Sequence, residues 1–458
     1  MSRICFVLAF VLLLLSSTMG RAADSVDPLA KQLLTEASKI MQELKDRGVK
    51  NVGVLKFRIE KGTQPVDRVG PLNGNLADRL ELALILSNNA QNPVGIIHDA
   101  SSVAAGIAGA DHRTPDGLQK LFAAQYPLAW GTEKVSPDAL LVGTAKMETG
   151  GDLNVSIFLF DNKSNKPSKL SQFKVAPTVT ELAEAGESFV LRGIFDGGQV
   201  QLAAADRSEK ASKEAAEKAK QIYDKPQDYH PLSPKNNGAP IGLQIQYDGI
   251  TKPFEFRDGH AQIPEPNERQ KVTFILSRKV NDPHTYAIVL KVNGENTIGR
   301  ERKNDQQCRK WVLAPNSPAI TLKGFQLDDK TAAAFRVASS QESAARAIDY
   351  GRDVGTISVV VFREAAKGLP DDGPGTKLLG PTESDAEEGL AILMRGVLPE
   401  QAGDLGTLRS KLSTQLSAKD STRGIILDGT KIDQPTKMVE FKEDPIPVMS
   451  GVIVYYKP

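Results

Sequence analysis

Two pairs of neighbouring histidine and aspartate residues are the first candidates for chemistry in this chain. They are His98-Asp99 and Asp111-His112, and imidazole and carboxylate groups are ligands that Zn²⁺ accepts. A metal site built from these four residues would need two distinct loops to converge. Histidines at the surface or at loop ends are the alternative interpretation. The spacing therefore predicts no metal site.

Cys308 is a second candidate, and it lies in the run Gln307-Cys308-Arg309-Lys310. Neighbouring cations lower the pKa of a thiol and favour the reactive thiolate. A catalytic cysteine also needs a general base and an oxyanion hole, and no motif supplies either. We therefore interpret Cys308 as a thiol without a catalytic role.

Cations gather around this cysteine. Residues 300–310 carry five cations against two acids. Such a stretch is either a solvated charged loop or a contact for an anion or a polysaccharide. The candidate partner or ligand contacts are Arg300, Arg302, Lys303, Arg309, Lys310 and Trp311.

Motifs that would define an enzyme do not stand out. The chain has no Gly-x-Ser-x-Gly elbow and no His-Glu-x-x-His pair. The glycines Gly106 and Gly109 lack the lysine and hydroxyl residues of a phosphate-binding loop. We predict no catalytic residue, no cofactor and no enzymatic activity.

Length and charge narrow the class of protein further. The chain has 458 residues, in which 57 Lys and Arg balance 56 Asp and Glu. A net charge of +1 gives no general attraction to nucleic acid or to an anionic membrane surface. Aromatic residues, at 6%, offer no stacking ladder for single strands. The length predicts two or three domains.

The N-terminal segment has the pattern of a secretory signal peptide. Arg3 precedes an apolar run from Ile4 to Leu15, and small and polar residues follow. The run is too short for a bilayer core, which needs about 20 residues. We predict a signal peptide over residues 1–22, with an uncleaved anchor as the alternative. No cysteine follows for lipid attachment, so we expect a periplasmic or secreted protein with no transmembrane span after cleavage.

Residues 24–202 show the alternation of strands and helices that is typical of an α/β sandwich with a mixed sheet. Asp27-Pro28 begins a helix, which Gly48 ends. Glycines at 150–151 predict an antiparallel hairpin between the last two strands. We expect strands over 52–57, 94–98, 138–146 and 153–160, and helices over 76–86, 101–108 and 114–122.

The order of these segments resembles a known α/β domain. The segments are Val52-Gly-Val-Leu-Lys-Phe57, Leu76-Ala-Asp-Arg-Leu-Glu-Leu-Ala-Leu-Ile-Leu86, Asp138-Ala-Leu-Leu-Val-Gly-Thr144 and Leu153-Asn-Val-Ser-Ile-Phe-Leu-Phe-Asp161. They are similar to the domain shared by curli-secretion channel subunits, FlgO-like flagellar lipoproteins and the N-terminal part of TolB. The resemblance covers residues 50–202 and implies binding or assembly in a cell envelope. The lipidated cysteine of the channel subunits is missing here, so the resemblance argues little for a pore.

A charged segment over residues 203–240 separates the two halves. It begins with a helix rich in Ala, Glu and Lys, in which Glu209 and Lys213 form a favourable i,i+4 pair. Because this helix has almost no apolar stripe, we expect a solvated connecting helix rather than a coiled coil. The prolines that follow predict an irregular linker.

Residues 241–458 predict a β-sandwich, because short apolar runs recur between turn signals. Asn293-Gly294 is a strong signal for a two-residue hairpin. We expect strands over 242–247, 271–277, 287–292, 319–322, 332–337, 356–362 and 452–456, and an exposed insertion over 365–389. The predicted fold class is α+β multidomain: an N-terminal α/β sandwich, a helical linker and a C-terminal β-sandwich.

The second half also resembles an uncharacterised bacterial domain. The segments that carry the resemblance are Ala287-Ile-Val-Leu-Lys-Val-Asn-Gly294, Trp311-Val-Leu-Ala-Pro315, Thr331-Ala-Ala-Ala-Phe335 and Val354-Gly-Thr-Ile-Ser-Val-Val-Val-Phe-Arg-Glu364. Asn293 stands where that domain usually has Asp, and Phe325 where it usually has Trp. This resemblance implies a fold and no activity.

Together these features predict an exported, non-enzymatic envelope protein that acts in protein binding or in the assembly of a cell-envelope complex. The expected partner is an envelope protein, and nucleic acid is not expected. The alternative is a carbohydrate- or peptidoglycan-binding protein that uses the β-sandwich, with Trp311, Tyr455 and Tyr456 as sugar platforms. A hydrolase with a site scattered along the chain is the third hypothesis.

Overall fold

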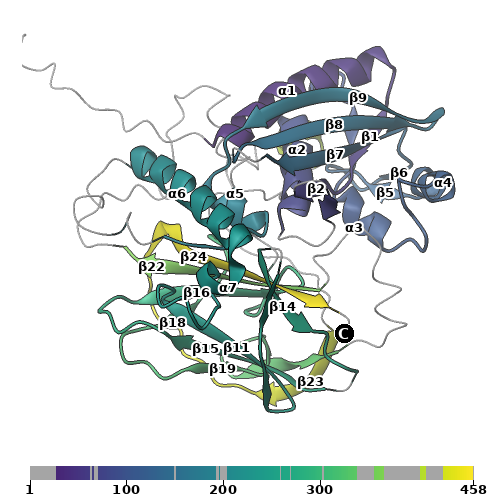
Figure 1. Cartoon of the computed structure of the whole chain (residues 1–458). Helices are drawn as coiled ribbons and strands as arrows, with labels where there is room; N and C mark the ends of the chain where they lie inside the picture. The colour runs from purple at the N-terminus through teal and green to yellow at the C-terminus, as the bar shows by residue number, and fades with distance from the viewer. Residues whose placement is uncertain are drawn as a thin grey trace, which may run out of the picture.

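The computed structural model describes twelve stretches of the chain, which are residues 27–61, 64–66, 71–148, 151–191, 195, 204–257, 259–268, 270–301, 304–337, 355–365, 403–408 and 427–456. The predicted signal peptide and all but the first residue of the predicted insertion lie outside them. Helices and sheets mix along the chain, so the fold is α+β (Figure 1). The purple and blue elements form one group, and the teal to yellow elements form a second.

A seven-stranded sheet organises the first group. β7 pairs in parallel with β1 and β2 along one side, β4 extends the sheet beyond β1, and β8 and β9 continue it antiparallel on the other side. The elements are α1 (Pro28–Asp46), β1 (Asn51–Val54), β2 (Arg58–Lys61), β3 (Gln64–Val66), α2 (Leu72–Ser87), β4 (Gly95–Ile96), α3 (Ala100–Ala105), α4 (Pro115–Ala123), β5 (Tyr126–Pro127), β6 (Lys134–Val135), β7 (Ala139–Met147), β8 (Leu153–Asp161) and β9 (Ser164–Val175). The predicted hairpin between β7 and β8 is confirmed.

Helices cover both faces of this sheet. Neighbouring strand residues point to opposite faces, so Leu141 packs with α1 and α2 while Leu140 packs with α3 and α4. Each face is therefore buried under a separate apolar cluster. Gly143 in β7 leaves room for the Phe57 ring, with which any Cβ at this position would collide.

The first helix begins and ends where the sequence predicts. The Asp27 carboxylate accepts hydrogen bonds from the N–H groups of Leu29 (2.9 Å) and Ala30 (3.1 Å), and Pro28 occupies the first helical turn. These bonds satisfy donors that a helix N-terminus otherwise leaves unpaired. Gly48 follows the helix with a φ of +70°, a conformation that glycine adopts readily.

The chain passes to the second group at α5 (Val179–Glu184) and β10 (Phe189–Val190). β10 pairs antiparallel with β24 (Glu443–Tyr456), far along the sequence. Leu182 and Phe189 belong to the same apolar cluster as the C-terminal strands. The sequence assigned these residues to the N-terminal half, whereas their packing places them against the C-terminal sheets.

The connecting segment contains the predicted helix, α6 (Ala204–Asp224). The expectation that it is solvated is wrong for one face, because Ala211, Ala215 and Ile222 are buried. Small side chains four residues apart line up on a helix and allow close packing without an apolar stripe. Arg207 on the same helix forms two hydrogen bonds with the Asp444 carboxylate, at 2.6 and 2.9 Å.

The described strands of the C-terminal half form three sheets. The largest runs β13-β14-β24-β22-β16-β17, with β10 and β18 at its sides, the second runs β12-β11-β15-β19, and the third runs β20-β21-β23. The remaining elements are α7 (Pro226–Tyr229), β11 (Ile241–Tyr247), β12 (Ile250–Lys252), β13 (Glu255–Arg257), β14 (His260–Pro264), β15 (Val272–Arg278), β16 (Tyr286–Val292), β17 (Glu295–Asn296), β18 (Trp311–Leu313), β19 (Ile320–Leu322), β20 (Gly324–Gln326), β21 (Thr331–Arg336), β22 (Thr356–Glu364) and β23 (Leu427–Asp433). The predicted turn is confirmed, because Asn293 and Gly294 both have positive φ and join β16 to β17.

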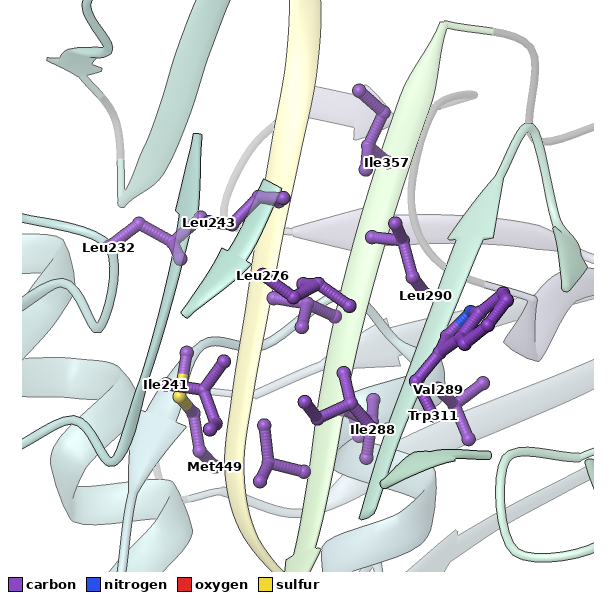
Figure 2. Packing of buried hydrophobic residues seen from close by; sticks show 14 of the residues in the cluster. Leu232, Ile241, Leu243, Leu276, Ile288, Val289, Leu290, Trp311, Ile357 and Met449 are labelled. Atoms are coloured by element: carbon purple, nitrogen blue, oxygen red, sulfur yellow. The ribbon is translucent and has the colours of Figure 1, made fainter. Parts of the chain in front are cut away.

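One apolar core joins the two larger sheets. Leu243 and Leu276 come from the four-stranded sheet, and Ile288 and Ile357 come from the eight-stranded sheet (Figure 2). All of them are 5% exposed or less. Replacing such a leucine or isoleucine with alanine costs about 2–5 kcal/mol. This core fixes the positions of the strands and loops described next.

Candidate functional site

The described cations of the predicted contact stretch form ion pairs with nearby acids. Arg300 lies 3.3 Å from the Glu295 carboxylate, and its guanidinium lies over the Phe325 ring at 5.4 Å. Arg309 lies 3.0 Å from the Glu301 carboxylate. Each of these two arginines therefore has a nearby acid as a partner.

Lys310 and Trp311, from the same stretch, contribute to the packing. Lys310 lies 3.0 Å from the Glu443 carboxylate and 5.2 Å above the Phe362 ring. Trp311 is only 8% exposed, and its indole N–H donates to the Thr297 hydroxyl at 2.9 Å. Arg302 and Lys303 lie outside the described residues. The structure thus brings four of the six predicted contacts together as parts of the fold.

Tyr455, a second aromatic residue predicted as a sugar platform, is half-buried. Tyr455 packs against the C-terminal core, and Tyr456 follows it at the end of β24. Neither Trp311 nor Tyr455 is among the large apolar side chains that the described part of the chain exposes, and the side chain of Tyr456 lies outside that part. These two rings are therefore poorly placed to act as surface platforms.

The thiol of Cys308 is 3% exposed. Burial raises its pKa to about 11. A thiol with such a pKa is protonated at neutral pH, and the protonated form is a weak nucleophile. The environment of Cys308 is that of a structural thiol.

His98 forms an ion pair with a buried acid. Its Nδ1 lies 2.9 Å from Oε1 of Glu81 in α2, and the Asp99 N–H donates to Oε2 of the same carboxylate at 3.0 Å. Burial alone would lower the pKa of His98, but the Glu81 carboxylate raises it to about 9. A histidine that is protonated at neutral pH cannot accept a proton as a general base. The pair acts as a structural contact at the end of β4.

The second histidine and aspartate doublet lies elsewhere. The Arg113 guanidinium pairs with the Asp111 carboxylate at 2.8 Å, and the His112 ring contacts Phe160 edge to face. Within the stretches that the structure describes, no three His, Cys, Asp or Glu side chains form a group suited to a metal ion.

A buried charged contact connects the two groups of elements, and Arg79 of α2 is its centre. Arg79 Nη1 lies 2.8 Å from Glu181 Oε1 and 3.5 Å from Asp27 Oδ2, and Nη2 lies 3.5 Å from Glu184. Burial alone would lower the pKa of Arg79, but the three carboxylates raise it above its usual range. Because Glu181 and Glu184 lie on α5, this arginine links α2 to the C-terminal core.

The C-terminal side of this contact carries a second buried pair. Lys291 of β16 lies 2.7 Å from the Asp305 carboxylate, and both side chains are at most 6% exposed. Glu184 lies near enough to influence the pKa of Lys291. We call the set Asp27, Arg79, Glu181, Glu184, Lys291 and Asp305 the charged interface. No sequence motif marked it, because its charges lie far apart along the chain.

A shallow groove of about 460 Å³ opens on the surface of the C-terminal half. One wall comes from α7 and the loop after it, and the other comes from β13 and the residue before it. The lining residues are Gln227, Ser233, Pro234, Lys235, Phe254, Glu255, Phe256 and Arg257. We call this surface the β13 groove.

Aromatic rings surround this groove. The rings of Phe254 and Phe256 lie 6.4 Å apart on one side of the strand, and the buried His230 ring lies 5.2 Å from Phe256. Tyr223 and Tyr229 are 52% and 46% exposed at the C-terminal ends of α6 and α7. Exposed aromatic side chains near a concave surface are typical of binding sites.

The sequence held one signal for this surface. Phe254 and Phe256 alternate with charged residues, which is the period of a strand with one apolar face. The opposite wall lies in a stretch interpreted as an irregular linker. Only the fold shows that these two segments meet.

No protein-family model matches this chain, and no curated protein matches it in sequence. The two resemblances drawn from the sequence therefore stay predictions. None of the helices in the described stretches is both long and apolar enough to cross a membrane.

Proposed function

We propose that this chain is an exported, non-enzymatic binding protein of a cell envelope, and that the β13 groove holds a protein partner. In this proposal the N-terminal α/β sandwich and the C-terminal β-sandwich act as one rigid carrier of the groove. The groove itself is the observation that carries the proposal, because its concave surface is lined by the half-buried rings of Phe254 and Phe256.

The environment of the candidate catalytic residues supports a role without catalysis. Burial raises the pKa of Cys308 to about 11, and the pKa of His98 is raised to about 9. Neither group is in the protonation state that a nucleophile or a general base needs at neutral pH. The resemblance of residues 50–202 to envelope assembly domains supports the same proposal.

Polysaccharide binding is the second candidate function. Tyr223 and Tyr229 favour it, because exposed tyrosines can stack on sugar rings while their hydroxyl groups remain in water. In this role they take the place of Trp311 and Tyr455, two of the three residues that the sequence suggested.

The test compares binding by the mature wild-type protein and by two charge variants. Phe254→Glu places a carboxylate in the groove, and Ile250→Glu, at a residue that is 65% exposed on β12, is the matched control. The immobilised proteins are exposed to purified envelope protein fractions and to purified cell-wall polysaccharide. Saturable protein binding that is lost only in Phe254→Glu supports the proposal. Saturable binding of polysaccharide alone would replace it with the second candidate.

A further inference from the structure

Among the described strands, β13 is the last one of its sheet, and its residues line the β13 groove. Within that part of the chain it pairs only with β14, and β14 pairs with β24 on the other side. An edge strand presents unpaired backbone N–H and C=O groups that can pair with another chain. The position of β13 therefore supplies a backbone template beside a groove.

The register shows which backbone groups face outward. Arg257 pairs with His260 across a two-residue turn, and Phe256 pairs with Ala261. The residues that close such a turn exchange hydrogen bonds, so the next pair is the non-hydrogen-bonded one. The N–H and C=O of Phe256 therefore point away from β14, at the outer edge of β13. Among the described residues, no backbone hydrogen bond outside this hairpin involves Phe256.

The side chains around this edge suit alternating apolar groups. Phe254 and Phe256 are two residues apart, so both rings lie on one side of the strand, 6.4 Å from each other. Pro234 on the opposite wall adds apolar surface. A strand added beside β13 would present every second side chain to these rings.

The charges at the groove pair with one another. Lys235 lies 3.1 Å from the Asp228 carboxylate, and Arg257 lies 2.8 Å from the Glu255 carboxylate. Two cations therefore balance two acids along the rim. Such a rim gives no net attraction to a polyanion such as nucleic acid or to an anionic membrane. An occupant without net charge matches it best.

We propose that an extended, uncharged segment of a partner protein adds to β13 as a new edge strand. Its backbone bonds to the N–H and C=O of Phe256, and its apolar side chains at alternate positions contact Phe254 and Phe256. This is the mode of recognition known as strand addition. The inference rests on the proposed function and specifies how the groove recognises its partner.

The test begins with a random decapeptide library displayed on phage and selected on the mature protein. We expect enriched peptides with an apolar residue at every second position and no net charge. Enriched peptides without that alternation would overturn strand addition. Gln227→Arg and Pro234→Lys, both at exposed positions on the opposite wall, should each weaken the selected peptides about tenfold without affecting folding. Unchanged affinity in both variants would also overturn it, because the peptides would then bind elsewhere.

The second step methylates the backbone nitrogens of one selected peptide, one at a time. Strand addition predicts that a methyl group on the one peptide amide that donates to the Phe256 carbonyl weakens binding about fivefold, since it removes a hydrogen bond of about 1 kcal/mol. Methyl groups on the two neighbouring amides, whose N–H groups would point away from β13, should change the affinity by less than about twofold. Equal effects at all positions would reject strand addition and leave groove binding intact. If the protein bound polysaccharide and the library yielded no enriched peptide, both strand addition and the binding of a protein partner in the groove would be rejected.

Discussion

The charged interface and the β13 groove show opposite uses of charge in this molecule. In the interface, Arg79 is enclosed by three carboxylates that come from two other segments. At the groove, the charges lie on an exposed rim and pair locally, and aromatic rings form the concave part. The comparison shows that buried charge connects the two halves of this chain, while the binding that we propose would depend on apolar groups and on the outer edge of β13.

The largest effect should follow from removing Arg79. Arg79→Ala leaves Glu181 and Glu184 buried without their partner, which costs about 3–5 kcal/mol of unfolding free energy. Urea unfolding at pH 7 measures the loss. Arg47→Ala, which breaks an exposed pair with Glu43, is the matched control and should cost less than about 1 kcal/mol. Equal losses in the two variants would mean that the interface does not hold the halves together.

Acid should weaken the region beneath the groove through His230. This ring is fully buried, and burial lowers its pKa to about 3. The folded protein then resists protonation while the unfolded chain accepts a proton near pH 6.5, so stability falls as the pH drops from 6.5 toward 3. The loss should approach about 4 kcal/mol at the lower limit.

Urea unfolding of His230→Gln between pH 7 and pH 4 tests whether His230 causes the loss of stability in acid. The variant should show a smaller loss of stability with acid than the wild type. His112→Gln is the control and should show the pH dependence of the wild type, because this substitution does not remove the buried His230 imidazole. An unchanged pH dependence in His230→Gln would assign the acid sensitivity to other groups.

The cap of the first helix should have a smaller effect. Asp27→Ala removes two hydrogen bonds to the N–H groups of Leu29 and Ala30, together with the longer contact to Arg79. We expect a loss of about 1–2 kcal/mol. Asp27→Asn retains a capping oxygen but no charge, so its difference from Asp27→Ala in urea unfolding separates capping from the charged interface. Equal losses in both variants would show that charge alone matters.

The smallest effect concerns His98. Its pKa is raised to about 9 by Glu81, so the ion pair stabilises the fold below pH 6.5 and is lost as the pH rises from 6.5 to 9. Because about half of the ring is in solvent, we expect about 1 kcal/mol at most. Thermal melts of His98→Gln at pH 6 and pH 9.5 should differ from the wild type only at pH 6. A difference at both values would indicate lost packing.

The sequence predicted local features well because they depend on neighbouring residues. Asn293-Gly294 produces its hairpin, and the Asp27-Pro28 cap begins α1. The sequence did not predict β9, because its lysines, serines and proline interrupt the alternation of apolar and polar residues that marks a strand. The sequence also did not predict the buried face of α6, because alanine side chains are too small to produce a clear apolar stripe.

The candidate sites were harder to predict because they depend on contacts between distant segments. Arg79 and Glu181 are 102 residues apart, and the walls of the β13 groove come from separate stretches. The cations around Cys308 suggested a contact surface, yet nearby acids and aromatic rings engage Arg300, Arg309 and Lys310. A run of charge in a sequence does not show whether its partners lie within the same fold.

Amide hydrogen exchange at Phe256 tests the central claim most directly. The protein is labelled with ¹⁵N-phenylalanine, and exchange is followed with and without a peptide selected on the groove. The account predicts that the Phe256 amide becomes protected on binding, while the Phe274 amide, already inside the β11–β15 ladder, stays unchanged. An unprotected Phe256 amide in the fully bound protein would contradict it.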